Sequence, residues 1–112
     1  MRKGKMIAQG AHASLAVLLD RGSITDHEFT LELDAPTEAW LGGRFTKVCV
    51  SVDSEAALDA IVAAARAAKL PCALITDAGV TEFHGVPTKT CCAIGPAWTD
   101  DVDAVTGSLP LL

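Results

Sequence analysis

A long alanine-rich segment, 54–70, separates two short apolar segments, 46–53 and 72–77, and this succession constrains the fold more than any other feature. The flanking segments, TKVCVSVD and CALITD, are apolar on both alternating faces, as strands covered on both sides are. The segment between them has apolar residues at helical spacing, and Asp53 or Ser54 can cap its start. Strand, helix and strand in succession predict a right-handed crossover that joins a parallel pair.

The remaining elements complete a single α/β domain over residues 1–112. Apolar spacing predicts a first helix over 5–19, and shorter signals predict a helix over 37–41, a strand over 89–95 and a last helix over 99–107. Residues 26–36 are expected to form an acidic connection. The expected buried stripes are Ile7, Ala11, Leu15 and Leu18 in the first helix, and Leu58, Ile61, Ala65 and Ala68 in the alanine-rich helix.

Charge distribution leaves a polyanionic partner open. The net charge of −5 argues against a nucleic-acid partner. However, Arg2, Lys3 and Lys5 concentrate positive charge near the start, whereas the acids cluster in 26–38 and 100–103. A local basic patch can outweigh the net charge.

Several classes of protein are excluded or disfavoured. The four cysteines lie mostly in apolar segments without a C-x-x-C spacing, and the chain has neither a signal peptide nor an apolar run long enough to span a bilayer. We therefore expect a reduced, soluble, cytoplasmic protein. Three scattered histidines disfavour a metal site, and phosphate-binding and nucleophile-elbow motifs are absent.

The first candidate site is a polar row on the first helix. Lys5, Gln9 and His12 are spaced i, i+4 and i+7, so they share one helical face, padded by alanines. An exposed polar face is the alternative interpretation. Lys5, however, occupies the first turn, where the helix dipole disfavours a cation, and such a cation can hold a phosphate or a developing oxyanion.

The second candidate site is the segment 76–90, TDAGVTEFHGVPTKT. Asp77 ends a predicted strand, at the edge where open α/β sheets place ligands. A simple turn explains Asp77 and Gly79 but not the surrounding threonine hydroxyls at 76, 81, 88 and 90. Such a loop can position a water molecule or a sugar.

Together these residues resemble the type II peptidyl-tRNA hydrolase family. The resemblance is carried, in order along nearly the whole chain, by KGKMIAQGAHA, TKVCVSVDSEAAL, LITDAGVTEF, GVPTKTCCAIGP and VTGSLPLL. It implies a three-layer α/β/α fold with a small mixed sheet, often in a homodimer. It also implies a carboxylic ester hydrolase that releases the peptide from the terminal ribose of tRNA without a metal or organic cofactor.

The resemblance also implies the site residues. The family's site falls on Lys5, Gln9, His12, Asp77, Thr81, Thr88 and Thr90. As hypotheses, Asp77 orients or deprotonates water held by Thr81, Lys5 stabilises the oxyanion or neutralises the terminal phosphate, and Gln9 fixes the ester or ribose. Whether the nucleophile is water or a threonine hydroxyl stays open. The expected contacts to the tRNA backbone are Arg2, Lys3, Arg44, Lys47 and Lys89.

One departure keeps other functions open. Family members have a strand before KGK, which this sequence lacks, and we expect the true start to lie upstream. The alternatives are a catalytically weak module that binds tRNA or protein, and a nucleotide-binding or small-molecule-binding α/β domain.

Overall fold

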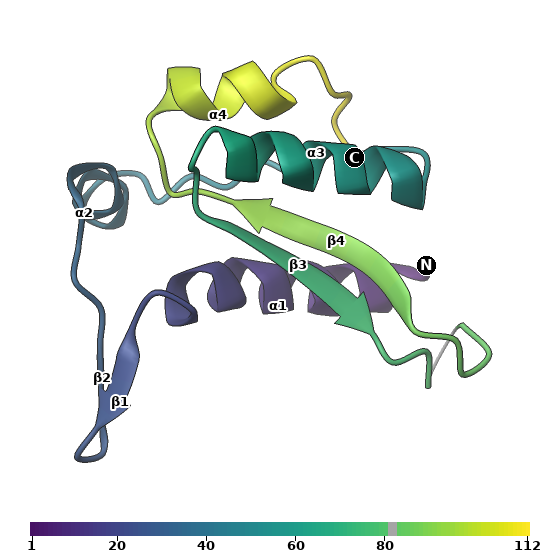
Figure 1. The fold of residues 1–112 in the computed structure, drawn as a ribbon, viewed down its shortest axis with the longest axis horizontal. Coiled ribbons are helices and arrows are strands. Elements are labelled where there is room, and N and C mark those ends of the chain that lie inside the picture. Colours follow the sequence, from purple (N-terminus) through teal and green to yellow (C-terminus); the bar gives the residue numbers. More distant parts are fainter. Residues whose placement is uncertain (81–82) are drawn as a thin grey trace.

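The fold has three layers, with a two-stranded sheet between helices. The computed structural model describes residues 1–80 and 83–112. Helix α1 (Lys3–Leu19) covers one face of the sheet formed by β3 (Cys72–Asp77) and β4 (Thr88–Ile94), and α3 (Glu55–Ala67) with α4 (Thr99–Thr106) covers the other (Figure 1). The predicted α/β class and the positions of the main helices are confirmed.

The parallel strand pair predicted from the sequence is wrong for the described residues. Strands β3 and β4 pair antiparallel, and segment 46–53 forms no strand beside them. Its one bridge joins Val50 to Leu111, supported by hydrogen bonds from the Ser51 N–H to the Pro110 carbonyl and from the Leu112 N–H to the Cys49 carbonyl. A strand-like sequence therefore stays extended but largely exposed, because no described strand lies alongside to complete its ladder.

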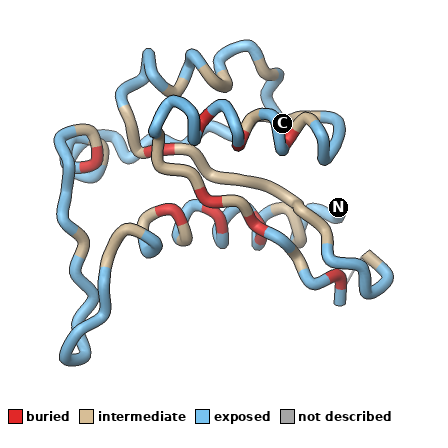
Figure 2. Tube along the Cα trace, in the orientation of Figure 1, coloured by how far each residue is buried: buried red, intermediate tan, exposed pale blue. Residues whose placement is uncertain are grey.

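The first helix buries a different face from the one predicted. Its buried residues are Gln9, Ala13 and Val17, whereas Ile7 is 74% and Leu15 60% exposed (Figure 2). The apolar stripe expected from Ile7, Ala11, Leu15 and Leu18 is therefore wrong. Packing against β3 and β4 selects the face that carries Gln9, because the strands supply hydrogen-bond partners for that amide.

The alanine-rich helix follows its sequence more closely. The Ser54 hydroxyl accepts a hydrogen bond from the Ala57 N–H at 3.0 Å, which caps α3. Leu58 and Ala65 are buried as expected, but Val62, at 4% exposed, replaces Ile61 and Ala68 as the third buried residue. With Ala73 and Ile75 of β3, these residues form the core on this side of the sheet.

The predicted acidic connection contains a hairpin. Strands β1 (Ser23–Thr25) and β2 (Glu28–Thr30) pair antiparallel and project from the body of the molecule (Figure 1). Helix α2 (Ala35–Gly42) then begins at Asp34, whose carboxylate accepts from the Thr37 N–H at 3.0 Å. No helix among the described residues is long and apolar enough to cross a membrane.

Candidate active site

The two candidate sites meet at one ion pair. Lys5 lies in the first turn of α1 and Asp77 is the last residue of β3, 72 positions later. The Lys5 Nζ lies 2.7 Å from the Asp77 Oδ1, and the two side chains are 15% and 12% exposed. A carboxylate therefore accompanies the cation that the helix dipole disfavours, in a place that is largely shielded but still reached by solvent.

The loop after β3 fixes the second oxygen of Asp77. The Gly79 N–H donates to the Asp77 Oδ2 at 2.8 Å. The hydrogen bond from Lys5 and this backbone donor hold the pKa of Asp77 below its ordinary value. Asp77 is therefore ionised at neutral pH and can accept further hydrogen bonds through its remaining lone pairs.

Replacing Gly79 should destabilise this loop. Gly79 has a φ of +84°, and a Cβ there would collide with the backbone of Val86. We expect Gly79→Ala to lower the free energy of unfolding by about 1–3 kcal/mol, measured by urea denaturation. The matched control is Gly10→Ala in the interior of α1, where nothing lies within 4 Å of the new Cβ. That change should raise stability by about 0.5–1 kcal/mol, and equal effects of the two variants would contradict the account.

A bulge in β4 aligns a second polar group beside the ion pair. Ile75 pairs with Cys91 and Thr76 with Lys89, so Thr90 is the extra residue of a bulge. The Thr90 hydroxyl donates to the Gln9 Oε1 at 2.6 Å, and the Cys91 thiol donates to the Gln9 carbonyl at 3.3 Å. Consecutive strand residues normally face opposite sides, so the bulge is what lets both reach α1. With its Oε1 held, Gln9 can direct its amide N–H groups to a ligand.

Removing the Thr90 hydroxyl should leave the buried Gln9 oxygen without its donor. Gln9 is 8% exposed, so we expect Thr90→Val to cost about 1–3 kcal/mol of unfolding free energy. Thr88→Val is the control, because the Thr88 hydroxyl donates only to the exposed Val86 carbonyl in its own loop. Its effect should stay within about 0.5 kcal/mol in the same urea titration. A Thr90→Val variant as stable as this control would contradict the assigned bond.

The other predicted residues are not joined to this pair of contacts. His12 is exposed on α1, one turn beyond Gln9, and Arg2 and Lys3 lie at the start of the same helix. Thr81 lies outside the described residues. Sequence reasoning singled out neither Gly79 as a donor to the carboxylate nor Cys91 as a partner of Gln9, and the glycine within DAG was the one available signal.

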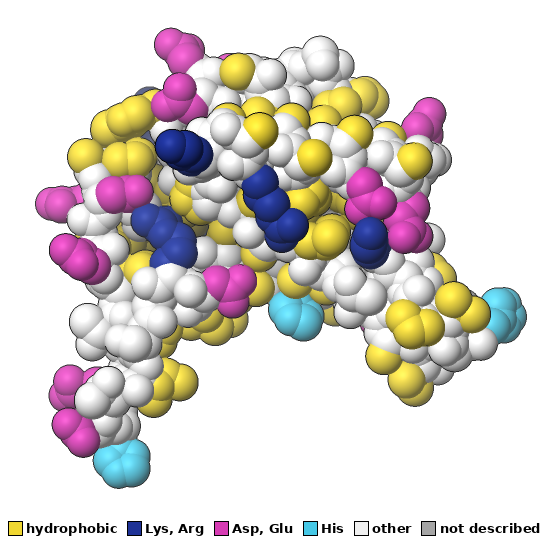
Figure 3. All heavy atoms as spheres, in the orientation of Figure 1, with side chains coloured by type: hydrophobic (Ala, Val, Ile, Leu, Met, Phe, Trp, Pro, Cys, Tyr) yellow, Lys and Arg dark blue, Asp and Glu magenta, His cyan; other side chains and the backbone are white. Residues whose placement is uncertain are grey.

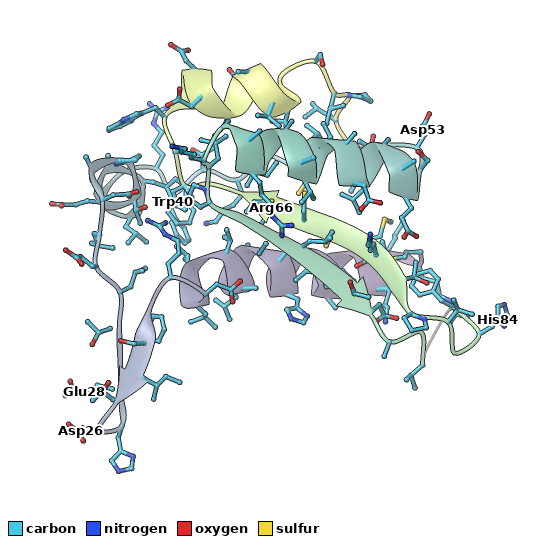
Figure 4. The ribbon with its side chains drawn as sticks, viewed as in Figure 1. Asp26, Glu28, Trp40, Asp53, Arg66 and His84 are labelled. Carbon is cyan, nitrogen blue, oxygen red and sulfur yellow. The ribbon has the colours of Figure 1, made fainter. Side chains whose placement is uncertain are left out.

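Two of the predicted tRNA contacts have partners elsewhere. The Lys89 Nζ lies 3.0 Å from the Asp59 Oδ1 of α3, and this partner raises the pKa of Lys89. Lys47 lies near α2, with its Nζ 2.8 Å from the centre of the Phe45 ring and 5.2 Å from that of Trp40. Figure 4 shows Trp40 at the end of the molecule opposite His84, which follows β3.

Metal-ion chemistry has no evident centre in the part of the chain that the structure describes. No group of three or more His, Cys, Asp or Glu side chains is arranged there to hold a metal ion. The polar atoms that converge are an ammonium, a carboxylate, an amide and a hydroxyl. Such a set can orient water and stabilise negative charge on a substrate oxygen.

Comparison with known proteins identifies the family. All of residues 1–112 match the family model described as Peptidyl-tRNA hydrolase PTH2. The chain belongs to the peptidyl-tRNA hydrolase PTH2 family. The resemblance found from the sequence motifs is thereby confirmed.

Relatives in this family are similar along their whole length. A protein of Methanocaldococcus jannaschii named peptidyl-tRNA hydrolase is 39% identical over 112 residues, which cover 100% of this chain and 90% of the relative. A Halobacterium salinarum protein of the same name is 42% identical, covering 99% and 88%. One from Haloquadratum walsbyi is 36% identical over 111 residues, covering 99% and 88%.

Proposed function

We propose that this chain hydrolyses the ester between a peptide and the terminal ribose of tRNA, using the Lys5–Asp77 pair and Gln9. The observation that carries the proposal is the 2.7 Å contact between Lys5 and Asp77, residues that come from opposite ends of the sequence. Membership of the PTH2 family, whose relatives are named for this activity, supports the substrate.

The proposed chemistry begins with the nucleophile. Asp77 has one oxygen bonded to Lys5 and the other to the Gly79 N–H, and it still offers lone pairs to a water molecule. That water adds to the ester carbonyl carbon and gives a tetrahedral oxyanion. The Lys5 ammonium, with N–H donors beyond the one given to Asp77, stabilises this oxyanion. A threonine hydroxyl as nucleophile is the competing form of this step.

The second half of the reaction releases the two products. The bond between the carbonyl carbon and the ribose oxygen breaks, the ribose oxygen takes up a proton, and the peptide leaves as a carboxylate. We assign to the Gln9 amide the positioning of the ester or ribose, with its orientation held by Thr90. Thr81 completes the proposed site by holding the water, and His12 and Thr88 contact the substrate.

Binding of the tRNA body is assigned to the basic residues near the site. Arg2 and Lys3 at the start of α1 and Lys89 on β4 are proposed to contact phosphates without reading sequence. Arg44 and Lys47 are proposed as more distant contacts. We further propose that the protein acts in the cytoplasm as a homodimer, which the family resemblance supports. Sedimentation equilibrium tests the dimer, and a single monomer mass would contradict it.

Single-turnover kinetics test the proposed function. Excess protein is mixed with N-acetyl-aminoacyl-tRNA, and release of the N-acetyl amino acid is compared with binding of deacylated tRNA under the same conditions. Hydrolysis well above the spontaneous rate is expected. Binding without hydrolysis would instead indicate a non-catalytic tRNA-binding module, and tight nucleotide binding without either would indicate the third class.

A further inference from the structure

We propose that the open edge of β3 binds the peptide part of the substrate as an added parallel strand. This inference rests on the proposed function and names where the peptide lies. Among the described residues β3 pairs only with β4, so its other edge carries unpaired backbone groups. An extended peptide can complete such an edge through main-chain hydrogen bonds.

The pairing pattern shows which backbone groups are available. The Gly95 N–H donates to the Pro71 carbonyl, which makes 71 and 95 a hydrogen-bonded pair. Antiparallel pairs alternate, so Cys72 and Leu74 belong to non-hydrogen-bonded pairs and direct their N–H and C=O groups to the open edge. These groups recognise any peptide backbone, which suits an enzyme that must accept peptides of any sequence.

The direction of the added strand follows from the chemistry. The scissile carbonyl is the last group of the peptide, and Asp77 is the last residue of β3. A peptide whose ester lies at the Lys5–Asp77 pair therefore runs parallel to β3, with its N-terminal residues toward Cys72. Six residues of β3 extend about 20 Å, enough to contact about five or six peptide residues.

An apolar groove lies on the same side of the molecule. It follows α1 and is lined by Ala8, Ala11, His12, Leu15, Ala16, Leu19 and Asp20. Gln9 contacts β4 and Lys5 contacts β3, so continuing around the helix in that direction passes beyond β3 to this groove. We define these seven residues as the α1 groove. Side chains of the added strand would alternate between the α1 groove and the α3 side, where Arg66 extends toward β3 (Figure 4).

The charges beside this edge favour a peptide over RNA. Figure 3 shows Lys and Arg side chains spread across this face of the molecule. Arg21 is paired with Asp34 at 3.1 Å and Lys89 with Asp59 at 3.0 Å, so carboxylates offset these two charges. The groove between them is apolar, and its far end carries Asp20. A track for phosphates would need unpaired cations there instead.

The first test alters the substrate alone. Single-turnover hydrolysis is measured on one tRNA carrying an apolar hexapeptide, N-methylated at one amide at a time. An amide that donates to β3 should weaken half-saturating binding by about fivefold when methylated, and its neighbours should not, giving a period of two. The N-methyl amide nearest the ester is left out, because it contacts the reacting group. A loss without this period, or no loss, would overturn the proposal.

The second test alters the groove. Leu15→Asp places a charge in the α1 groove, whereas Ile7→Asp places the same charge on another face of α1; the two residues are 60% and 74% exposed. We expect Leu15→Asp to weaken half-saturation by the hexapeptidyl-tRNA about tenfold, with no change for N-acetyl-aminoacyl-tRNA and no effect of Ile7→Asp on either.

The outcomes separate this proposal from the proposed function. Hydrolysis of both substrates by the wild type, with equal effects of Leu15→Asp on both, would overturn the peptide site and leave the function standing. If Leu15→Asp also weakened binding of deacylated tRNA, the groove would belong to RNA. Hydrolysis of neither substrate by the wild type would overturn the function and the peptide site together.

Discussion

Asp77→Asn should lower the single-turnover rate of peptidyl-tRNA hydrolysis by about 10³-fold at saturating protein. The change keeps the shape of the side chain and the contact to the Gly79 N–H, but it removes the negative charge that orients or deprotonates the attacking water. Binding of deacylated tRNA should change little, because Asp77 lies where the ester reacts. The rate is measured by release of labelled N-acetyl amino acid.

The control for Asp77→Asn is a matched loss of carboxylate charge outside the site. Asp59→Asn removes the partner of Lys89 on α3, and both of these side chains are substantially exposed. We expect it to change the rate less than threefold, since exposed ion pairs contribute about 0–1 kcal/mol. An Asp77→Asn protein that folds like the wild type and retains its rate would remove Asp77 from the mechanism.

Lys5→Met should have the second largest effect, a loss of about 10²–10³-fold in the same rate. Methionine keeps most of the side-chain length and packing but lacks the ammonium that stabilises the oxyanion. Lys5→Arg keeps the charge with a different geometry, so its loss should be smaller. Lys69→Met, an equal charge change at the exposed end of α3, should leave the rate unchanged.

A binding role alone would give a different pattern for Lys5→Met. If Lys5 only neutralised a phosphate, the half-saturating concentration would rise and grow more sensitive to salt, while the maximal rate stayed constant. The circular dichroism spectrum and urea midpoint establish that the variant is folded. A loss confined to half-saturation would assign Lys5 to phosphate binding.

The site was more predictable from the sequence than the packing around it. The row on α1 and the end of β3 were both recognised, because their residue types are unusual for their positions. The specific pairing of Gln9 with Thr90 and Cys91 could not be predicted, since it depends on a bulge that shifts the register after Ile75. Bulges have no reliable signal in a single sequence.

Two errors have a common cause in tertiary context. The stripe of Ile7, Ala11, Leu15 and Leu18 has good helical spacing, but α1 is apolar over most of its surface, and polar partners on the strands decided which face was buried. Segment 46–53 has strand-like composition, yet composition cannot supply the neighbouring strand that a ladder requires. The hairpin of β1 and β2 was missed because Asp26 and His27 adopt positive φ without a glycine.

The most direct measurement is the single-turnover rate of the double variant Lys5→Met/Asp77→Asn beside each single variant. If the ammonium and the carboxylate act on one reacting ester, the double variant should be no more than a few-fold slower than the slower single variant, because each change already disables the shared step. Rate losses that multiply in the double variant would mean that the two groups act independently, and unchanged rates in all of them would place the chemistry elsewhere.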